Sequence, residues 1–383
     1  MLGSVRPGGA PRLHGRPVAS ASWTRGNPLV TPRAKRQAGP VTNDVVQIEQ
    51  VDVHDEAGVG AHHEVLSAAY HAESPDHPLP TVPEVLALVR SEREAVRTEL
   101  WLMRVDGRRV GTYRLDLPQL DNTDLVEVEL GIHPQHQHRG HGRRLCEHVT
   151  QRSRELHRHQ MVAEVYEPAD GSQNRAMRFA EATGARRSLG EMRRVLDLTA
   201  VDRARLAALR AEAESRSGGY QLVAWTGPCP DDLVDGYAAL IGRMSTDAPM
   251  GDLHIEPEHW DAARVRERDT LMAAQGRLCM ATAARLGPDG PLVAYTDIVT
   301  TRHDPPNAFQ WDTLVLREHR GHRLGLLVKV ANLERLLVEA PDARRVHTWN
   351  ADENTYMVAI NAAMGFAPAQ RESAWRLDLP RVD

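Results

Sequence analysis

The sequence predicts an α/β protein, with an α+β mixed sheet, in which one domain plan occurs twice. Strand and helix patterns alternate from about residue 45, and their order restarts after about residue 220. Two similar Gly- and Arg-rich turns lie 183 residues apart, and the length of 383 residues exceeds one ordinary domain. We therefore expect a basic tail at 1–43, domains at 44–199 and 220–383, and a connecting helix at 200–219.

Composition and charge exclude several classes of protein. The chain is 41% hydrophobic and 26% charged, which suits a globular protein with a sizeable core. No apolar run approaches the roughly 18–20 residues that span a bilayer, so a membrane-spanning role is excluded. Residues 1–40 hold seven basic side chains and no acid, so the formal charge of −5 leaves −12 on the rest. Such an acidic body argues against nucleic acid as a partner, because phosphate contacts supply most of that affinity.

The tail and the cysteines bear on where the chain resides. The first 40 residues contain six glycines, six prolines and no sustained apolar period, which predicts disorder. Cys146, Cys229 and Cys279 are too few and too scattered for a disulfide framework or a cysteine-based zinc site, and they indicate a reducing cytoplasm.

Local signals place the elements of the first repeat. Thr81 and Glu84 form a capping box, Asp106-Gly107 marks a hairpin turn, and residues 125–132 alternate acidic and apolar side chains as a half-buried strand does. Strands are predicted at 45–53, 100–105, 110–115, 125–132, 161–166 and before residue 198, and helices at 54–70, 81–96, 140–157 and 174–183.

The second repeat shows the same order. Gly287 and Gly290 flank a Pro-Asp pair that turns a second hairpin. Strands are predicted at 221–225, 278–285, 292–300, 309–316, 346–349 and 375–379, and helices at 233–244, 256–274, 321–339 and 354–364.

Two turns anchor the repeat, each following a strand and opening a helix. Free N–H groups at a helix start, together with the helix dipole, form an anion site that glycine lets a phosphate approach closely. Flanking arginines add the positive charge that the acidic body lacks. The two motifs are Gln137-x-x-Gly140-x-Gly142 and Arg320-x-x-Arg323-x-Gly325.

These motifs make the chain resemble the GNAT superfamily of acetyl-CoA-dependent N-acetyltransferases, whose signature is Gln/Arg-x-x-Gly-x-Gly/Ala between the fourth strand and the third helix. The first turn matches in full, whereas the second has Arg323 in place of the first glycine. The resemblance covers residues 45–383 as two tandem GNAT-type acyl-CoA N-acyltransferase domains of bacterial, actinobacterial type, and implies that the turns hold the pyrophosphate of acetyl-CoA. The residues implied in cofactor binding are Ile132, His133, Gln137, His138, Arg139, Gly140, His141, Gly142, Arg143, Asn174, Val315, Leu316, Arg317, Arg320, Gly321, His322, Arg323, Leu324, Gly325 and Asn354.

Asn174 and Asn354 each open the helix that follows the fifth strand. The resemblance implies that they contact the pantetheine arm. A helix N-cap is an equally good interpretation of either asparagine and does not exclude the first.

Carboxylates near the turns are candidate bases, since direct attack by an amine needs a group that takes its proton. Glu129 lies eight residues before Gln137, and Asp312 lies eight residues before Arg320. Glu127 shares a strand face with Glu129 and is a second candidate. The alternative is that these acids simply face solvent.

The family's usual proton donor to the thiolate is a tyrosine near the end of the fourth helix, where this chain has Asn361 in the second repeat. Tyr356 and Tyr166 are the nearby substitutes, and Tyr356 is our candidate. This departure motivates an alternative function, a CoA-binding sensor or scaffold without turnover.

Other polar clusters are weaker candidates. Asp247 and Asp252 lie in a loop that the resemblance assigns to the acceptor wall, where they would attract a cationic amine; a capped surface loop is the alternative. Four histidines crowd the first turn, but no carboxylate or cysteine lies at ligand spacing, so we expect no metal. They are His133, His136, His138 and His141.

The sequence thus predicts a cytoplasmic N-acetyltransferase that uses acetyl-CoA and a small-molecule amine, as a monomer or homodimer, without nucleic acid or membrane as partner. The second repeat is expected to be the catalytic one, because its Asn354 helix and its acidic loop are the fuller versions.

Overall fold

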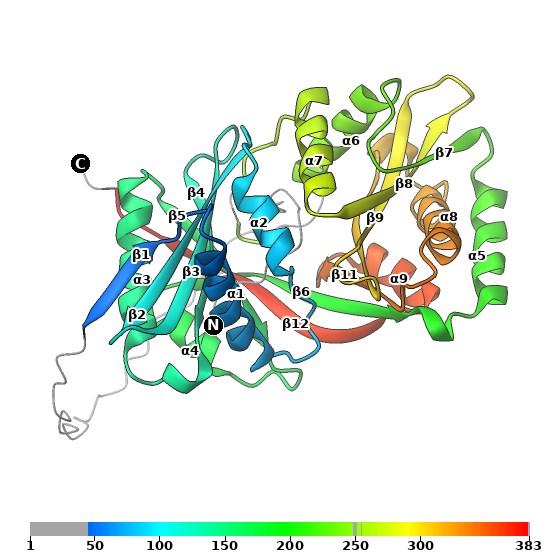
Figure 1. Ribbon diagram of the computed structural model, residues 1–383. Coiled ribbons are helices and arrows are strands. Elements are labelled where there is room, and N and C mark those ends of the chain that lie inside the picture. The colour runs from blue at the N-terminus through cyan, green and yellow to red at the C-terminus, as the bar shows by residue number, and fades with distance from the viewer. Residues whose placement is uncertain (1–44, 248–250, 254, 382–383) are drawn as a thin grey trace, which may run out of the picture.

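The computed structural model describes residues 45–247, 251–253 and 255–381. The predicted basic tail at 1–43 lies outside the described residues. Within the described chain, twelve strands form one mixed sheet in the order β1-β2-β3-β4-β5-β12-β6-β11-β10-β9-β8-β7 (Figure 1). The predicted α/β class with a mixed sheet is confirmed.

The elements of the first half follow the predicted order. They are β1 (Val46–Gln50), α1 (Glu56–His71), α2 (Val82–Arg90), β2 (Val96–Val105), β3 (Arg108–Pro118), β4 (Leu125–Ile132), α3 (His141–Glu155), β5 (Gln160–Glu167), α4 (Arg175–Ala182) and β6 (Arg186–Asp197). The capping box is present, since the Thr81 N–H donates to Glu84 Oε2 at 2.8 Å. Asp106 and Gly107 both have positive φ, as the hairpin between β2 and β3 requires.

The second half repeats this order after a connecting helix. Its elements are α5 (Arg203–Arg216), β7 (Tyr220–Thr226), α6 (Val234–Asp247), α7 (Ala262–Ala274), β8 (Arg277–Leu286), β9 (Leu292–Thr301), β10 (Asn307–Val315), α8 (Leu324–Glu339), β11 (Arg345–Ala351), α9 (Thr355–Met364) and β12 (Ala367–Asp378).

Two predicted helix bounds are wrong by six residues, and the helix predicted from residue 321 begins at Leu324. The helix expected to reach Val96 ends at Arg90, because Val96 already begins the hairpin strand β2. The helix expected from residue 256 begins at Ala262, where Asp261 caps it by accepting from the Arg264 N–H at 2.9 Å.

The last strand of each half pairs within the other half. β12 is antiparallel to both β5 and β6, and β6 in turn is antiparallel to β11. Figure 1 shows β12, in red, reaching into the half that holds β1 to β5. Trp375 of β12 is accordingly buried in the core of the first half, and Leu196 of β6 in that of the second. The predicted boundaries stay a prediction, but the two halves share one sheet.

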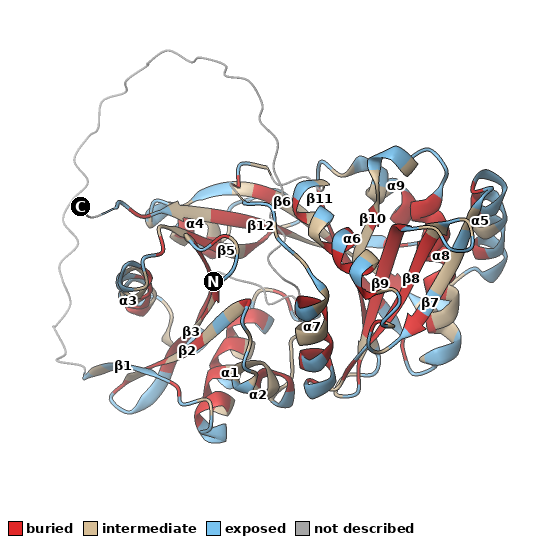
Figure 2. Cartoon of the chain, turned by 90° about the horizontal axis from the view of Figure 1, so that it is seen from above, coloured by how far each residue is buried: buried red, intermediate tan, exposed pale blue. Residues whose placement is uncertain are grey.

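Helices cover both faces of this sheet, whose strands hold much of the buried surface (Figure 2). On one face α1 packs on β3 and β4, α6 packs on β9, and α2 contacts α7 across the two halves. On the other face α3 packs on β3 and β4, and α8 packs on β8 and β9.

Each half contains one pair of parallel strands that separates. β4 pairs with β5 over only Leu125–Glu127, and β10 pairs with β11 over only residues 307–309. Beyond these pairs the strand ends diverge toward the two predicted turns. Glu129 and Asp312 both lie past the last paired residue, at the positions that the divergence leaves free.

Candidate active site

The first turn has the geometry that the sequence predicted for an anion site. After β4, a single 3-10 turn leads to Gly140, which adopts φ +82° and precedes α3. A Cβ at Gly140 would meet nothing within 4 Å, so space is open beside the helix start. Gln137 fixes the turn, because its Nε2 donates to the Ile132 carbonyl at 3.1 Å and its Oε1 accepts from Arg175 at 2.6 Å. The first N–H groups of α3 have no partner within the helix.

The first turn also keeps its positive charge. Arg139 and Arg143 form no ion pair with any residue that the structure describes. His138 Nε2 lies 3.2 Å from Arg175 Nη1, and His133 Nδ1 accepts from the Gln135 N–H at 3.4 Å. Two cations at a helix start favour a bound anion, since the dipole acts in the same sense.

The second turn is closed by the chain's own carboxylates. Asp247, at the end of α6, accepts from Arg317 Nε at 3.2 Å and from Arg320 Nη2 at 2.8 Å. Arg323, which adopts φ +58° where the first turn has Gly140, pairs with Glu212 of α5 at 2.6 Å. Two carboxylates thus offset two of the three positive charges that were predicted to meet a pyrophosphate.

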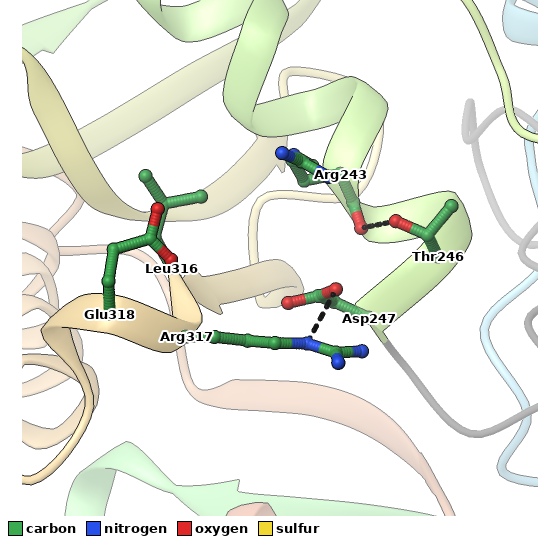
Figure 3. A pocket seen from close by; sticks show the side chains of 6 residues that line it. All are labelled: Arg243, Thr246, Asp247, Leu316, Arg317 and Glu318. Carbon is green, nitrogen blue, oxygen red and sulfur yellow. Dashed lines mark hydrogen bonds and ion pairs between the residues drawn. The ribbon is translucent and has the colours of Figure 1, made fainter.

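A pocket of about 290 Å³ lies beside the second turn (Figure 3). Figure 3 shows the guanidinium of Arg317 extended along Asp247, with Arg243 and Thr246 of α6 above them. Leu316 and Glu318 complete the lining. On the outer side of this turn, the Tyr220 hydroxyl lies 3.0 Å from His319 Nδ1, and its ring lies 5.3 Å from that of His322.

Glu129 has the environment of a general base. Its side chain is 4% exposed, and Oε1 accepts a 2.6 Å hydrogen bond from the Tyr70 hydroxyl of α1. Oε2 lies 3.5 Å from Arg114 Nη1 and has no hydrogen-bond partner among the described residues. Burial raises the pKa of Glu129 to about 7, against the opposing effects of Arg114 and Tyr70. A carboxyl with this pKa is partly ionised at neutral pH and can exchange protons there.

Glu127 lies on the same strand face. Burial, with Asp116 and Glu164 nearby, raises its pKa to about 8, so it is mainly protonated at pH 7. Of the two predicted acids on β4, Glu129 is the one ionised to a larger extent at pH 7.

In the second half, one of the two charges of the Arg114–Glu129 pair is reversed. Asp297 and Asp312 lie 183 residues after Arg114 and Glu129, so an acid stands where the first half has an arginine. Asp297 is fully buried and accepts from Tyr237 and from Arg268 of α7, both at 2.7 Å. Asp312 is partly buried at a bulge in β10. The two halves therefore offer different sites.

The comparisons with known proteins agree with this geometry. Residues 63–185 match the model of the Acetyltransferase (GNAT) family. A tandem GNAT protein from the clavulanic acid biosynthesis pathway is 30% identical, with a TM-score of 0.73 over 88% of this chain and 100% of that one. This chain belongs to the GNAT superfamily.

Two further solved structures share the GNAT fold at lower identity. A GCN5-related N-acetyltransferase from Sphaerobacter thermophilus is 16% identical, with a TM-score of 0.57 over 88% of this chain and 97% of that one. A glucosamine N-acetyltransferase region of a fungal multi-domain β-N-acetylglucosaminidase is 13% identical, with a TM-score of 0.59 over 88% of this chain and 38% of that one. No curated protein sequence matches the chain.

The two asparagines of the GNAT pattern are helix caps. Asn174 Oδ1 accepts from the Met177 N–H at 2.9 Å, and its Nδ2 donates to the Tyr166 carbonyl at 2.6 Å. Asn354 Oδ1 accepts from the Met357 N–H at 3.2 Å. The cap interpretation is confirmed for both, and contact with pantetheine stays a prediction.

The structure separates the other predicted site residues of this GNAT protein. Tyr356 is 55% exposed in the first turn of α9. Asp252, five residues after Asp247, has an exposed side chain, and its backbone bonds to Ser188 and Arg376. The carboxylate of Asp247 is instead paired with the arginines of the second turn.

Two residues in contact with Glu129 were not predicted from the sequence. Tyr70 and Arg114 come from two elements that only the fold brings together around Glu129, whereas Tyr166, which lies beside Tyr70, was named as a possible proton donor. For Arg114, the 183-residue offset held a signal, since it aligns that arginine with Asp297. The helix position of Tyr70 carried none.

Metal and membrane signals are both missing from the described part of the chain. No group of three or more His, Cys, Asp or Glu side chains there could hold a metal ion. The rings of His133 and His136 lie 5.8 Å apart at the first turn without a third ligand. In the same residues, every helix is too short or too polar to cross a bilayer.

Proposed function

We propose that the chain transfers the acetyl group of acetyl-CoA to the amine of a small molecule, and that the first half carries out the reaction. The observation that carries this proposal is the buried Glu129, held by Tyr70 next to an anion site whose arginines are unpaired. The sequence favoured the second half. The ion pairs of Asp247 and Glu212 support the first half instead.

The residues of the first turn fit acetyl-CoA. Gly140 and Gly142 leave the backbone accessible, and a Cβ at Gly142 would come within 3.5 Å only of the Phe179 ring. The N–H groups that open α3 would hold the pyrophosphate, together with Arg139 and Arg143. When bound, the co-substrate supplies an acetyl group activated as a thioester.

Glu129 would then accept a proton from the substrate, and Tyr166 would donate one to the leaving group. Glu129 takes a proton from the ammonium, and the neutral amine attacks the acetyl carbon, so that an N–C bond forms while the C–S bond breaks. The nitrogen then loses a second proton, which replaces the one that the leaving sulfur takes from its donor, while Glu129 releases the first proton to solvent. Tyr166 is placed to supply it, because its hydroxyl is buried, has no hydrogen-bond partner among the described residues and lies in the same layer as Tyr70.

The second half would support the first rather than duplicate it. It contributes β12 to the sheet, and its segment before α7 docks on the first half, where the Glu256 N–H donates to Asn122 Oδ1 at 2.7 Å. Buried free thiols at all three cysteines support a reducing compartment, which we propose is the cytoplasm.

A thiol-release assay with acetyl-CoA and a panel of amines tests this proposal. Glu129→Gln should lower kcat/KM by about 100-fold or more, as loss of a general base does, while Asp312→Asn should leave it within about twofold. Both variants keep the size of the side chain and remove its charge. The reverse pattern would transfer catalysis to the second half, and binding of CoA without turnover across the panel would favour a sensor.

A further inference from the structure

One face of the central sheet gathers polar side chains from both halves. Tyr166 of β5 pairs in register with Glu372 of β12, and Arg193 of β6 pairs with Gln370 of β12 and with Trp349 of β11. Paired residues point to the same face of a sheet. Trp349 Nε1 donates to Glu372 Oε2 at 3.0 Å, which ties the strands together on that face. We call these five side chains, together with Glu129 of β4, the central layer; the five are Tyr166, Glu372, Arg193, Gln370 and Trp349.

Arg193 is an unusual member of the central layer. It is 3% exposed, and no carboxylate oxygen of the described chain lies within 4 Å of its nitrogens. Its Nη1 lies 3.2 Å from His347 Nδ1, and its Nε has no hydrogen-bond partner among the described residues. His347 is a neutral acceptor here, because burial lowers its pKa to about 3. A buried guanidinium without a close counter-ion destabilises the fold.

Two further polar atoms of the central layer also lack hydrogen-bond partners in the described chain, namely Tyr166 Oη and Glu129 Oε2. The Tyr70 ring bridges them, since it lies 5.6 Å from that of Tyr166 while its hydroxyl holds Glu129. His77, from the loop between α1 and α2, covers the layer with its ring 5.2 Å from Tyr166 and 6.1 Å from Trp349. The layer thus has the Glu129 carboxylate at one end and the Arg193 guanidinium at the other, with aromatic rings and the Glu372 carboxylate, which accepts from Trp349, between them.

We propose that the acceptor is a zwitterion, with its amine at Glu129 and a carboxylate bound by Arg193. This inference rests on the proposed function and names its substrate class. Because β5 and β12 lie between β4 and β6, and β4 diverges from β5 at Glu129, the two backbones are at least three strand spacings of about 4.8 Å apart. Long side chains shorten this gap, so the amine and the carboxylate of the substrate are several bonds apart, as in a dipeptide or an ω-amino acid. A guanidinium suits a carboxylate because its fork donates two parallel hydrogen bonds.

Matched acceptor pairs test the carboxylate. We would compare 6-aminohexanoate with 6-aminohexanamide, and glycylglycine with glycylglycinamide, in the thiol-release assay. The wild-type chain should prefer each acid by about tenfold or more in kcat/KM, mainly through a lower KM. Arg193→Met should abolish this preference, and Arg193→Lys should restore part of it. Arg194→Met is the matched control, because Arg194 is the next residue of β6 and points to the opposite face.

The outcomes separate the two proposals. If the wild-type chain uses acids and amides equally, the carboxylate proposal is overturned and the acetyltransferase stands, whether or not Arg193→Met folds. If no amine is acetylated, the proposed function fails, and ligand binding then tests whether Arg193 holds a carboxylate. Thermal stabilisation by 6-aminohexanoate but not by its amide, lost in Arg193→Met, would support the carboxylate site; equal stabilisation by both would overturn it.

Discussion

Tyr70 on α1 donates a 2.6 Å hydrogen bond to Glu129 on β4, and this contact favours the ionised form of the candidate base. Burial raises the pKa of Glu129 to about 7, and the hydrogen bond opposes that rise because it stabilises the ionised form. A base must be ionised to accept a proton. Activity should therefore increase with pH and level off above pH 7, with kcat/KM reporting an apparent pKa of about 7 in the wild-type chain.

Replacing Tyr70 should shift the rise of kcat/KM with pH to higher pH. Tyr70→Phe keeps the ring but removes the donor to Glu129, so the pKa of the carboxyl should rise above about 7. Rates at pH 6.5 should fall more than rates at pH 8.5. The pH dependence of kcat/KM measures the shift, and Tyr237→Phe is the control, because Tyr237 likewise donates to a buried carboxylate, that of Asp297, but in the second half. If the apparent pKa of kcat/KM is the same in Tyr70→Phe as in the wild type, Glu129 is not the titrating base.

Glu127 should make the fold less stable at high pH. Its pKa is about 8 in the folded chain, against about 4.3 in an unfolded one, so the folded chain binds the proton more tightly. This contribution is fully present below about pH 4 and is lost as the pH rises through 8. Glu127→Gln, which cannot ionise, should therefore unfold at a higher temperature than wild type at pH 9, by a few degrees, and show little difference at pH 5. Thermal unfolding at both pH values measures this. The exposed Glu147→Gln should show no pH-dependent difference, and an equal gain at both pH values would argue against ionisation of Glu127.

Local signals explain why the turns and most elements were predicted correctly. Gly140 takes a left-handed conformation that glycine favours, and Thr81 caps its helix through a contact three residues away. Such features depend on neighbours in sequence. The exchange of β6 and β12 does not, because each strand would satisfy its hydrogen bonds equally well in either half.

Long-range pairing likewise decided the roles of individual acids. Asp247 looked like a ligand for an amine because its local loop is acidic. Its partners, Arg317 and Arg320, come from a turn about 70 residues later, so only the fold reveals that its carboxylate is already paired with arginines. Arg193 gave no sequence signal at all, since its isolation from carboxylates follows from four strands of two halves meeting around it.

The exchanged strand makes the first half dependent on the end of the chain. Deleting residues 367–383 removes β12, which pairs with β5 and β6 and buries Trp375 in the first core. The shortened chain should lose cooperative unfolding and all transfer activity, although every proposed catalytic residue remains. Circular dichroism during heating and the thiol-release assay measure both. Removal of only residues 380–383, which follow β12, is the control, and a stable, active chain ending at 366 would show that the exchange is dispensable.

The ion pairs at the second turn should limit the chain to one molecule of CoA. Because Asp247 and Glu212 occupy the three arginines there, calorimetric titration of the wild-type chain with CoA should give a stoichiometry of about one. Gly142→Trp should abolish that binding, because an indole beside the Phe179 ring would fill the space at the start of α3. Gly325→Trp, its counterpart in the second turn, should not abolish it. The double variant Asp247→Ala, Glu212→Gln frees the arginines and should admit a second, weaker equivalent. Two equivalents in the wild-type chain, or binding that survives Gly142→Trp and vanishes in Gly325→Trp, would place the cofactor in the second half.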